Sequence, residues 1–290
     1  MSNMKYYLVT TEHLENSVWF RDETDYKIGM NTVALITSLT QVKVLTFILM
    51  SNHVHFVLEC WPGEAEYFIN EIKRHYSRYI ENKYGIKESL RRNKVDIREI
   101  DPSEEDLEKT IAYVQMNCVA AGICLYPSQY RWGAGRCFFN ETPGKGVPFG
   151  TLNRSKQKRL LHSNIQVPDE FIVCEDGYII PESYLEIHAV EKIFRNAKRM
   201  SYFQNTSSKA KRKLETGEND PPSFKDYILI SAIEDLCQSL FRKNNISELT
   251  NSEKGELLRQ IRYRFSSNIH QLARVTNLDY DTVVRLLDTA

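Results

Sequence analysis

Two histidines at alternate positions, His53 and His55, are the residues of this chain best suited to chemistry. They lie in an apolar, β-branched run that predicts a β-strand, and alternate residues of a strand point to the same face. Two imidazoles on one face can share a metal ion. The same spacing also fits two histidines that merely line a polar surface, because an HxH pattern alone has low specificity.

A second candidate pair is Tyr113 and Asn117, four residues apart in a segment with helical periodicity. Residues at this spacing lie one helical turn above each other, so the phenol and the amide are expected to face one site. Taken separately, each residue has a plainer interpretation. Tyr113 would then be a half-buried core tyrosine, and Asn117 a polar residue near a helix end.

Together these two pairs could perform phosphoryl transfer. A tyrosine hydroxyl, with an ordinary pKa of about 10, can attack a DNA phosphodiester when a divalent cation neutralises and orients the phosphoryl oxygen. The product is a phosphotyrosine ester, which can be resealed without ATP. Two imidazoles and one amide oxygen leave coordination positions open, and such a set suits Mg²⁺ or Mn²⁺, the imidazoles favouring Mn²⁺.

Hydrophobic periodicity predicts the elements that carry these residues. We expect strands over residues 6–10, 42–49, 53–60 and 95–98, and helices over 28–39, 64–84 and 101–122. The last helix should start at a cap formed by Asp101, Pro102 and Glu104 and should stop at Gly122.

This order of elements predicts the fold class. Strand, helix, strand, strand, helix, strand is the order of a ferredoxin-like split βαβ antiparallel sheet, so we expect an α+β fold followed by an all-α carboxy-terminal region. A loop at 141–146 suggests three parts: a catalytic domain over 1–140, a helical region and linker over 141–222, and a helical domain over 223–290.

Bulk composition limits the class of protein. With 290 residues, 42% hydrophobic and 26% charged, the chain is typical of a soluble globular protein with two domains. Lys plus Arg and Asp plus Glu both total 38, so contact with nucleic acid would need local basic patches. Without a long apolar stretch or a signal-peptide pattern, we expect a cytoplasmic protein with no membrane contact. Six cysteines without a CxxC pair indicate reduced thiols, mostly in the core.

Three segments resemble one known family, the IS200/IS605-like tyrosine transposases of the HUH class, and especially the REP-associated tyrosine transposases. Residues 50–58 (MSNHVHFVL) resemble the family's histidine strand, commonly MPNHVH. Residues 113–122 (YVQMNCVAAG) resemble its tyrosine helix, commonly YIxxNPVxAG, and residues 127–132 are similar to the P…Y.W segment that follows. The three motifs occur in the family's order, across the first half of the chain.

The sequence departs from the family pattern in three places. Ser51 and Cys118 stand where proline is common, which changes local backbone stiffness more than chemistry. The segment after Gly85 is short and lacks the usual aromatic, arginine-bearing stretch, so the family's contacts with the DNA end are not carried over.

The resemblance implies a role for each candidate residue. His53 and His55 would bind the metal, Asn117 would take the place of the third, amide ligand, and Tyr113 would be the nucleophile. It also implies an HUH nuclease fold and a single-stranded or hairpin DNA substrate. Whether the protein is a monomer or a homodimer stays open.

Basic residues interleaved with aromatics predict DNA contacts on the second helix, because cations follow phosphates while rings stack on bases. The candidates are Lys73, Arg74, Arg78 and Lys83, with Arg91 and Arg92 just beyond. The alternative is a solvated helix face whose tyrosines pack on the sheet. Tyr76 and Tyr79 on this helix are rival nucleophiles if Tyr113 is structural.

The chain end, residues 271–287, has the pattern of a helix-turn-helix. Tyr280, Thr282 and Arg285 would then face outward, where a recognition helix contacts duplex DNA. The alternative is a helical packing module, since this pattern also occurs without DNA. For the whole protein, the competing hypotheses are a domesticated DNA-binding protein or repressor without turnover, and an RNA-directed protein.

Overall fold

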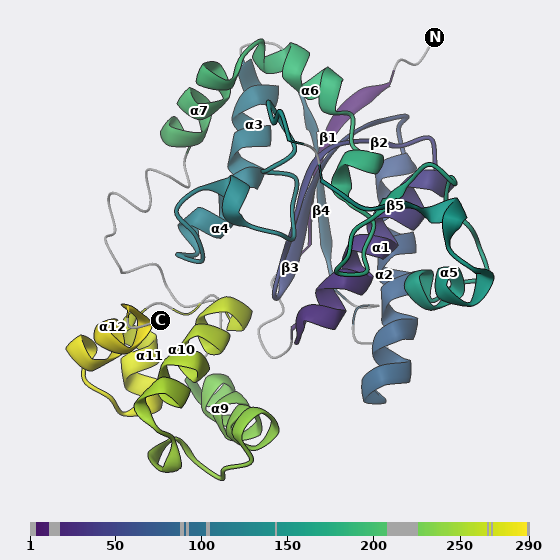
Figure 1. Ribbon diagram of the computed structural model, residues 1–290. Coiled ribbons are helices and arrows are strands. Elements are labelled where there is room, and N and C mark those ends of the chain that lie inside the picture. The colour runs from purple at the N-terminus through teal and green to yellow at the C-terminus, as the bar shows by residue number, and fades with distance from the viewer. Residues whose placement is uncertain are drawn as a thin grey trace.

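The computed structural model describes residues 4–11, 18–87, 90, 93–102, 105–142, 144–207, 226–265, 267 and 269–288. Its centre is a four-stranded antiparallel sheet in the order β2-β3-β1-β4. The strands are β1 (Lys5–Thr11), β2 (Lys43–Met50), β3 (His53–Cys60) and β4 (Val95–Ile100). With α1 (Glu23–Leu39) between β1 and β2 and α2 (Glu64–Tyr84) between β3 and β4, this confirms the predicted ferredoxin-like fold (Figure 1).

The two faces of the sheet carry different helices (Figure 1). On one face lie α1 and α2, where Phe56 of β3 packs edge-on against Phe68 of α2 with ring centroids 5.4 Å apart. The other face carries α3 (Asp106–Gln115) and α4 (Asn117–Ala120). Because neighbouring residues of a strand point to opposite faces, His55 faces α3 while Phe56 faces α2.

The structure departs from the single helix predicted over 101–122 at two places, the start of the helix and its middle. Helix α3 begins at Asp106, behind Glu105 with a left-handed φ of 66°, so the cap predicted at Asp101 and Pro102 was wrong; Glu104 lies outside the described residues. Arg199 donates to the carboxylates of Glu105 and Glu108 at 2.8 and 3.1 Å, a tertiary contact at the helix start that the local pattern could not indicate.

The same helix is interrupted at Met116, so that α3 and α4 replace the single helix expected. Its predicted stop is confirmed, since Gly122 has a φ of 68° and its N–H donates to Val119. A left-handed φ is free of steric cost only for glycine.

The hydrophobic core continues past the expected boundary at residue 140. Buried aromatic residues from both sides of it, such as Phe47, Phe149, Tyr178 and Phe194, belong to one cluster. The later part of this body contains β5 (Val147–Pro148), α5 (Arg154–Leu161), β6 (Ile172–Val173), α6 (Ile187–Phe194) and α7 (Ala197–Thr206), with 3₁₀ turns at Pro127–Gln129, Phe149–Thr151 and Pro181–Ser183. The division of the chain at residue 140 stays a prediction.

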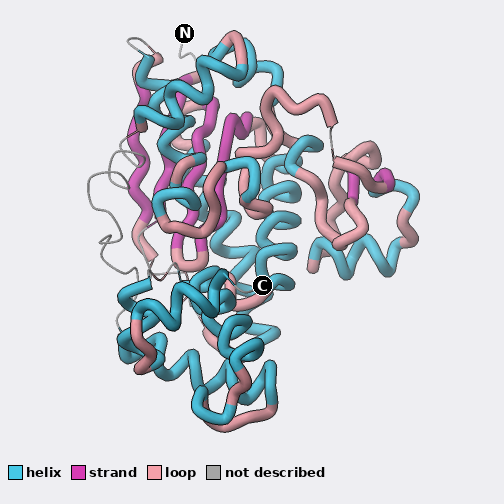
Figure 2. The backbone as a smooth tube through the Cα atoms, turned by 60° about the vertical axis from the view of Figure 1, so that its left-hand side comes forward, coloured by secondary structure: helices cyan, strands magenta, loops and turns pink. Residues whose placement is uncertain are grey.

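The carboxy-terminal residues form a separate helical unit with its own core, as predicted (Figures 1 and 2). It comprises α9 (Asp226–Phe241), a 3₁₀ turn at Ile246–Glu248, α10 (Asn251–Phe265), α11 (Ile269–Thr276) and α12 (Tyr280–Asp288). Leu272 and Val283 are fully buried between these helices, and the Asp279 side chain caps α12 by accepting from the N–H of Thr282 at 2.8 Å. The turn between α11 and α12 therefore has the predicted helix-turn-helix layout.

Two expectations from composition can be compared with the described residues. No helix among them is long and apolar enough to cross a membrane. All six cysteines are free thiols, and Cys60, Cys118, Cys137 and Cys237 are buried, which confirms the prediction of core thiols.

Asn31 of α1 ties the segment beyond residue 140 to the sheet, which leads to a test of the shared core. Its amide nitrogen donates to the Leu160 carbonyl at 3.0 Å, and its amide oxygen accepts from the Ile179 N–H at 2.8 Å. Asn31→Ala removes the partner of one buried backbone N–H and of one partly buried carbonyl, so we expect a loss of about 2 kcal/mol in the free energy of unfolding, measured with urea. Exposed Asn164→Ala is the matched control and should change it by less than about 0.5 kcal/mol.

Candidate active site

The two histidines form a buried, ordered pair on the α3 face of the sheet. His53 and His55 are only 4% and 2% exposed, and their rings lie nearly perpendicular with centroids 4.8 Å apart. The Nδ1 atom of His53 lies 2.8 Å from the amide oxygen of Asn52, and that of His55 lies 2.9 Å from the hydroxyl of Thr10. Because an amide oxygen only accepts, neutral His53 carries its proton on Nδ1 and its lone pair on Nε2.

The strand register positions these rings. Thr10 of β1 lies directly opposite His55 in the antiparallel pair, and the next residue, Thr11, accepts from the N–H of Val54 at 2.9 Å. Asn52 belongs to the tight turn between β2 and β3. Both imidazoles are therefore oriented through Nδ1 by side-chain oxygens, one from β1 and one from the turn before β3, an arrangement common among metal-binding histidines.

Tyr113 approaches the same face from a different element. Its half-buried ring on α3 lies edge-on to His55, with ring centroids 6.0 Å apart and planes at 84°. The structure thus brings the predicted tyrosine beside the histidine pair, although 58 residues of sequence separate it from His55.

Asn117 is held against the helix break by its own side chain. Its amide nitrogen donates to the carbonyls of Tyr113 and Val114 at 3.0 and 3.1 Å, and the thiol of Cys118 donates to Gln115 at 3.3 Å. Side-chain donors that take helix carbonyls compete with the backbone ladder, which accounts for the interruption at Met116. Since the amide nitrogen faces the helix, the amide oxygen is the atom suited to a ligand.

The donor set fits a hard or borderline divalent cation. Two imidazole nitrogens and one amide oxygen leave positions for water and a phosphate oxygen, as Mn²⁺ or Mg²⁺ requires. Among the described residues no group of three or more His, Cys, Asp or Glu is placed to hold a metal.

The rival tyrosines lie on the opposite face of the sheet. Tyr76 of α2 is 1% exposed and its hydroxyl donates to the Trp19 carbonyl at 2.8 Å, while the Tyr79 hydroxyl donates to Asp25 at 2.7 Å. Burial raises the pKa of both phenols above the ordinary value, which disfavours the phenolate. Neither hydroxyl can reach the imidazole pair.

Two of the predicted DNA-binding lysines have structural partners instead. Lys73 is buried and donates to the Asn93 carbonyl at 2.6 Å, and burial lowers its pKa. Lys83 contacts the carboxylates of Asp22 and Asp25 at 2.6 and 2.7 Å, and these bonds outweigh burial and raise its pKa. The prediction that these two lysines bind phosphate is corrected, because their ammonium groups are already engaged within the fold.

The remaining candidates are placed differently. Arg74 pairs with Glu71 one turn earlier on α2, whereas Arg78 on the same helix is exposed. Both lie away from the histidine face. Arg91 and Arg92 lie outside the described residues.

On α12, Arg285 is exposed and Tyr280 and Thr282 are half-buried. The guanidinium of Arg285 donates to the Thr282 hydroxyl at 3.3 Å. These three residues remain candidates for duplex contact.

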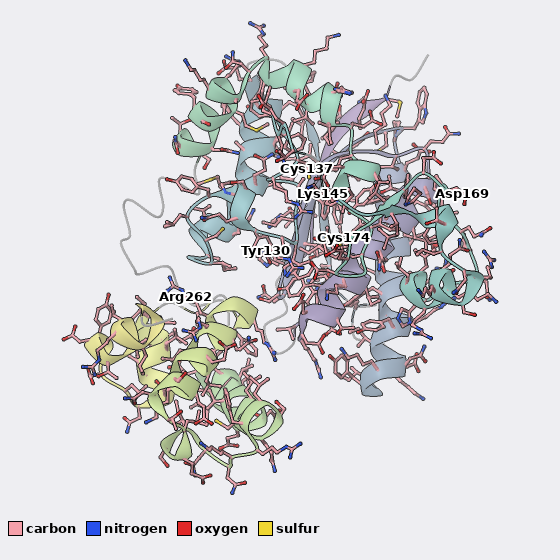
Figure 3. The ribbon with its side chains drawn as sticks, viewed as in Figure 1. Tyr130, Cys137, Lys145, Asp169, Cys174 and Arg262 are labelled. Atoms are coloured by element: carbon pink, nitrogen blue, oxygen red, sulfur yellow. The ribbon has the colours of Figure 1, made fainter. Side chains whose placement is uncertain are left out.

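The third sequence motif, residues 127–132, holds the end of β2 in place and adds no side chain to the histidine pair. The Tyr130 hydroxyl donates to the Leu49 carbonyl at 2.7 Å, the Leu49 N–H donates to the Trp132 carbonyl at 2.8 Å, and the Trp132 ring stacks on Tyr26. Tyr130, labelled in Figure 3, is only 3% exposed. The motif therefore fixes the end of β2 next to the turn that carries Asn52.

Sequence reasoning did not identify Thr10 or assign a role to Asn52. Asn52 had a signal, since it immediately precedes the paired histidines. Thr10 had none, because its contact with His55 depends on the β1–β3 register over a separation of 45 residues.

The paired carboxylates around Lys83 lead to a stability prediction. Burial raises the pKa of Asp22, but bonds from Lys83, the Asp25 N–H and Tyr84 outweigh it, so the pKa lies below its ordinary value of 3.8. A carboxyl whose pKa is lowered by folding stabilises the protein at any pH above its ordinary pKa. This stabilisation is lost as the pH falls through the folded-state pKa. We expect Lys83→Met to cost about 2 kcal/mol at pH 7, with the deficit shrinking below roughly pH 4.

Urea unfolding at pH 7, 4 and 3 measures this difference, with exposed Lys87→Met as the charge-matched control. A deficit that stays constant over this range, or an equal loss in the control, would contradict the assignment.

Comparison with known proteins agrees with the sequence motifs in the first third of the chain. Residues 1–95 match the family model described as "Transposase IS200 like", a segment that includes the histidine strand and ends before Tyr113. Among solved structures, that of a REP-associated tyrosine transposase bound to a REP hairpin aligns at 13% identity and a TM-score of 0.39, covering 47% of this chain and 79% of that chain. No curated protein matches the chain. Its first 95 residues are thus similar to IS200-like transposases, as the histidine strand predicted.

Proposed function

We propose that the protein is a metal-dependent, transposase-type endonuclease that cleaves and rejoins single-stranded DNA through a covalent 5′-phosphotyrosine on Tyr113. The observation that carries the proposal is the convergence of Tyr113 from α3 and the His53–His55 pair from β3, with ring centroids of Tyr113 and His55 6.0 Å apart. The match of residues 1–95 to IS200-like transposases supports the reaction class.

The metal-binding roles follow from the donor atoms. His53 and His55 would bind Mg²⁺ or Mn²⁺ through Nε2, and Asn117 through its amide oxygen. When bound, the cation supplies charge neutralisation at the phosphoryl oxygen. These three side chains are uncharged, so they do not neutralise the bound cation. Its positive charge would therefore remain available to a phosphodiester.

The role of Tyr113 is that of nucleophile. Its hydroxyl oxygen forms a bond to phosphorus, the bond from phosphorus to the 3′ oxygen breaks, and the phenol proton is transferred, in net terms, to the departing oxygen. The phosphotyrosine ester then accepts attack by a 3′ hydroxyl, which restores the phenol and joins the strands. The 5′ polarity of the link rests on the sequence resemblance.

The partners follow from the same resemblance. Single-stranded or hairpin DNA is the substrate, and Tyr280, Thr282 and Arg285 of the helical unit are candidates for duplex contact. The cytoplasm is the expected compartment, and a monomer or a homodimer satisfies the chemistry.

Substitution of the nucleophile tests the proposal directly. We expect Tyr113→Phe to abolish the covalent adduct with a fluorescent single-stranded oligonucleotide in Mn²⁺, detected by denaturing gel, because phenylalanine lacks the attacking oxygen. Tyr126→Phe is the matched control, since Tyr126 is 64% exposed, and it should retain adduct formation. Oligonucleotide binding without an adduct in the parent protein, across several metals, would instead favour a DNA-binding protein without turnover.

The oxygens that orient the imidazoles give a second test. Thr10→Val removes the hydroxyl next to His55 Nδ1 while keeping the shape of the side chain, so we expect roughly tenfold weaker Mn²⁺ binding. Isothermal titration measures the affinity, and adduct formation should recover at high Mn²⁺. Thr37→Val, on α1, is the control; equal Mn²⁺ affinity in both variants would show that Thr10 does not position the ligand.

A further inference from the structure

A cavity of about 490 Å³ lies between the segment before α1 and the helical unit. Val18 and Arg21 form one wall, and α9 and the end of α10 form the other, with Tyr227, Asp235 and Arg264 among the lining side chains. This volume falls within the usual range of ligand sites. None of the roles proposed above uses it.

The cavity is structurally connected to the histidine strand. Its wall continues into Trp19 and Phe20, whose N–H groups both donate to the Ser51 carbonyl at 2.7 and 3.2 Å. Ser51 opens the turn that leads directly to His53. These two hydrogen bonds tie the wall of the cavity to the turn that carries the histidine strand.

A second contact places basic α10 beside Gly122, the residue at which the segment carrying α4 ends. The guanidinium Nη2 of Arg262 lies 3.2 Å from the position that a β-carbon on Gly122 would take. Gly122 follows α4, the short helix whose first residue is Asn117. The Nε of Arg262 is buried and has no hydrogen-bond partner among the described residues. Figure 3 shows Arg262 at the edge of the helical unit that faces the part of the protein built on the four-stranded sheet. The Arg262 side chain as a whole is half-buried, and a guanidinium group suits a phosphate oxygen.

The lining of the cavity combines charge with an aromatic surface. Arg21 and Arg264 contribute two guanidinium groups against one carboxylate, Asp235, so the lining is net positive. Tyr227 is 60% exposed and offers a ring face for stacking. Cations for phosphates and rings for bases are the features by which proteins hold single strands.

We propose that this cavity binds one unpaired nucleotide of the DNA strand, with Arg21 and Arg264 contacting its phosphate and Tyr227 stacking on its base. Asp235 provides an acceptor for an exocyclic amine of that base. Arg262 extends the positive path from the cavity toward α4. The inference rests on the proposed function for the identity of the ligand as single-stranded DNA, and it gives the helical unit a role in holding the substrate strand.

Binding of a fluorescent single-stranded oligonucleotide to full-length Tyr113→Phe protein, followed by anisotropy over a series of salt concentrations, tests the cavity apart from cleavage. We expect Arg264→Gln to weaken binding roughly tenfold and to lower the salt slope by about 0.7, the value for one phosphate contact on a single strand. Tyr227→Leu should weaken binding about tenfold with an unchanged slope, because stacking is uncharged.

Two further variants keep the test decisive. Ser231→Trp, at an exposed position lining the cavity, fills the space without removing charge and should also weaken binding. Arg159→Gln, exposed on α5, removes the same charge elsewhere and should stay within twofold of the parent. Thermal unfolding confirms that each variant is folded.

The proposal is overturned if the cavity variants bind the single-stranded oligonucleotide within twofold of the parent, or if Arg159→Gln loses as much affinity as they do. It is also overturned if the cavity variants lose as much affinity for duplex DNA of the same sequence as for the single strand. Failure of the proposed function gives a different result. In that case the protein with Tyr113 forms no covalent adduct, while the differences in binding between the cavity variants and the parent remain.

Discussion

The antiparallel register between β1 and β3 is the constraint on which the site depends. It sets Thr10 opposite His55, and with the alternation of side chains it sends both imidazoles to one face and Phe56 to the other. A slip of one residue would exchange these faces, placing the histidines in the apolar layer under α2. Phe56 of β3, which packs against Phe68 of α2, thus helps to hold the imidazoles on the opposite face.

The tyrosine side of the site is built by a local exception to helix geometry. Asn117 bonds its amide nitrogen to carbonyls of its own helix, the helix is interrupted at Met116, and the amide oxygen is turned away from the backbone. A side chain anchored in this way loses less conformational entropy on binding a ligand. The strand and the anchored helix together position the metal donors and the nucleophile that we propose.

The charged residues of α2 show how composition can mislead about function. Lys73 and Lys83 are part of a basic and aromatic helix face that predicts nucleic-acid contact, yet their ammonium groups bind a backbone carbonyl and two carboxylates within the fold. Arg262 and Arg264 of α10, more than 200 residues after His53, lie instead beside Gly122 and in the wall of the cavity. Their position makes the helical unit part of the substrate path we propose.

The sequence by itself determined the order of strands and helices, the common face of His53 and His55, and the pairing of Tyr113 with Asn117, because these follow from periods of two and 3.6 residues that act locally. It also indicated the helical carboxy-terminal unit. Only the tertiary structure decided that Thr10 meets His55, that α2 lies on the far face with Tyr76 and Tyr79, that the core runs past residue 140 through Asn31, and that α10 abuts Gly122. These contacts join residues from about 45 to 150 positions apart, and the free energy that selects them comes from burial of the whole core, which no local pattern contains.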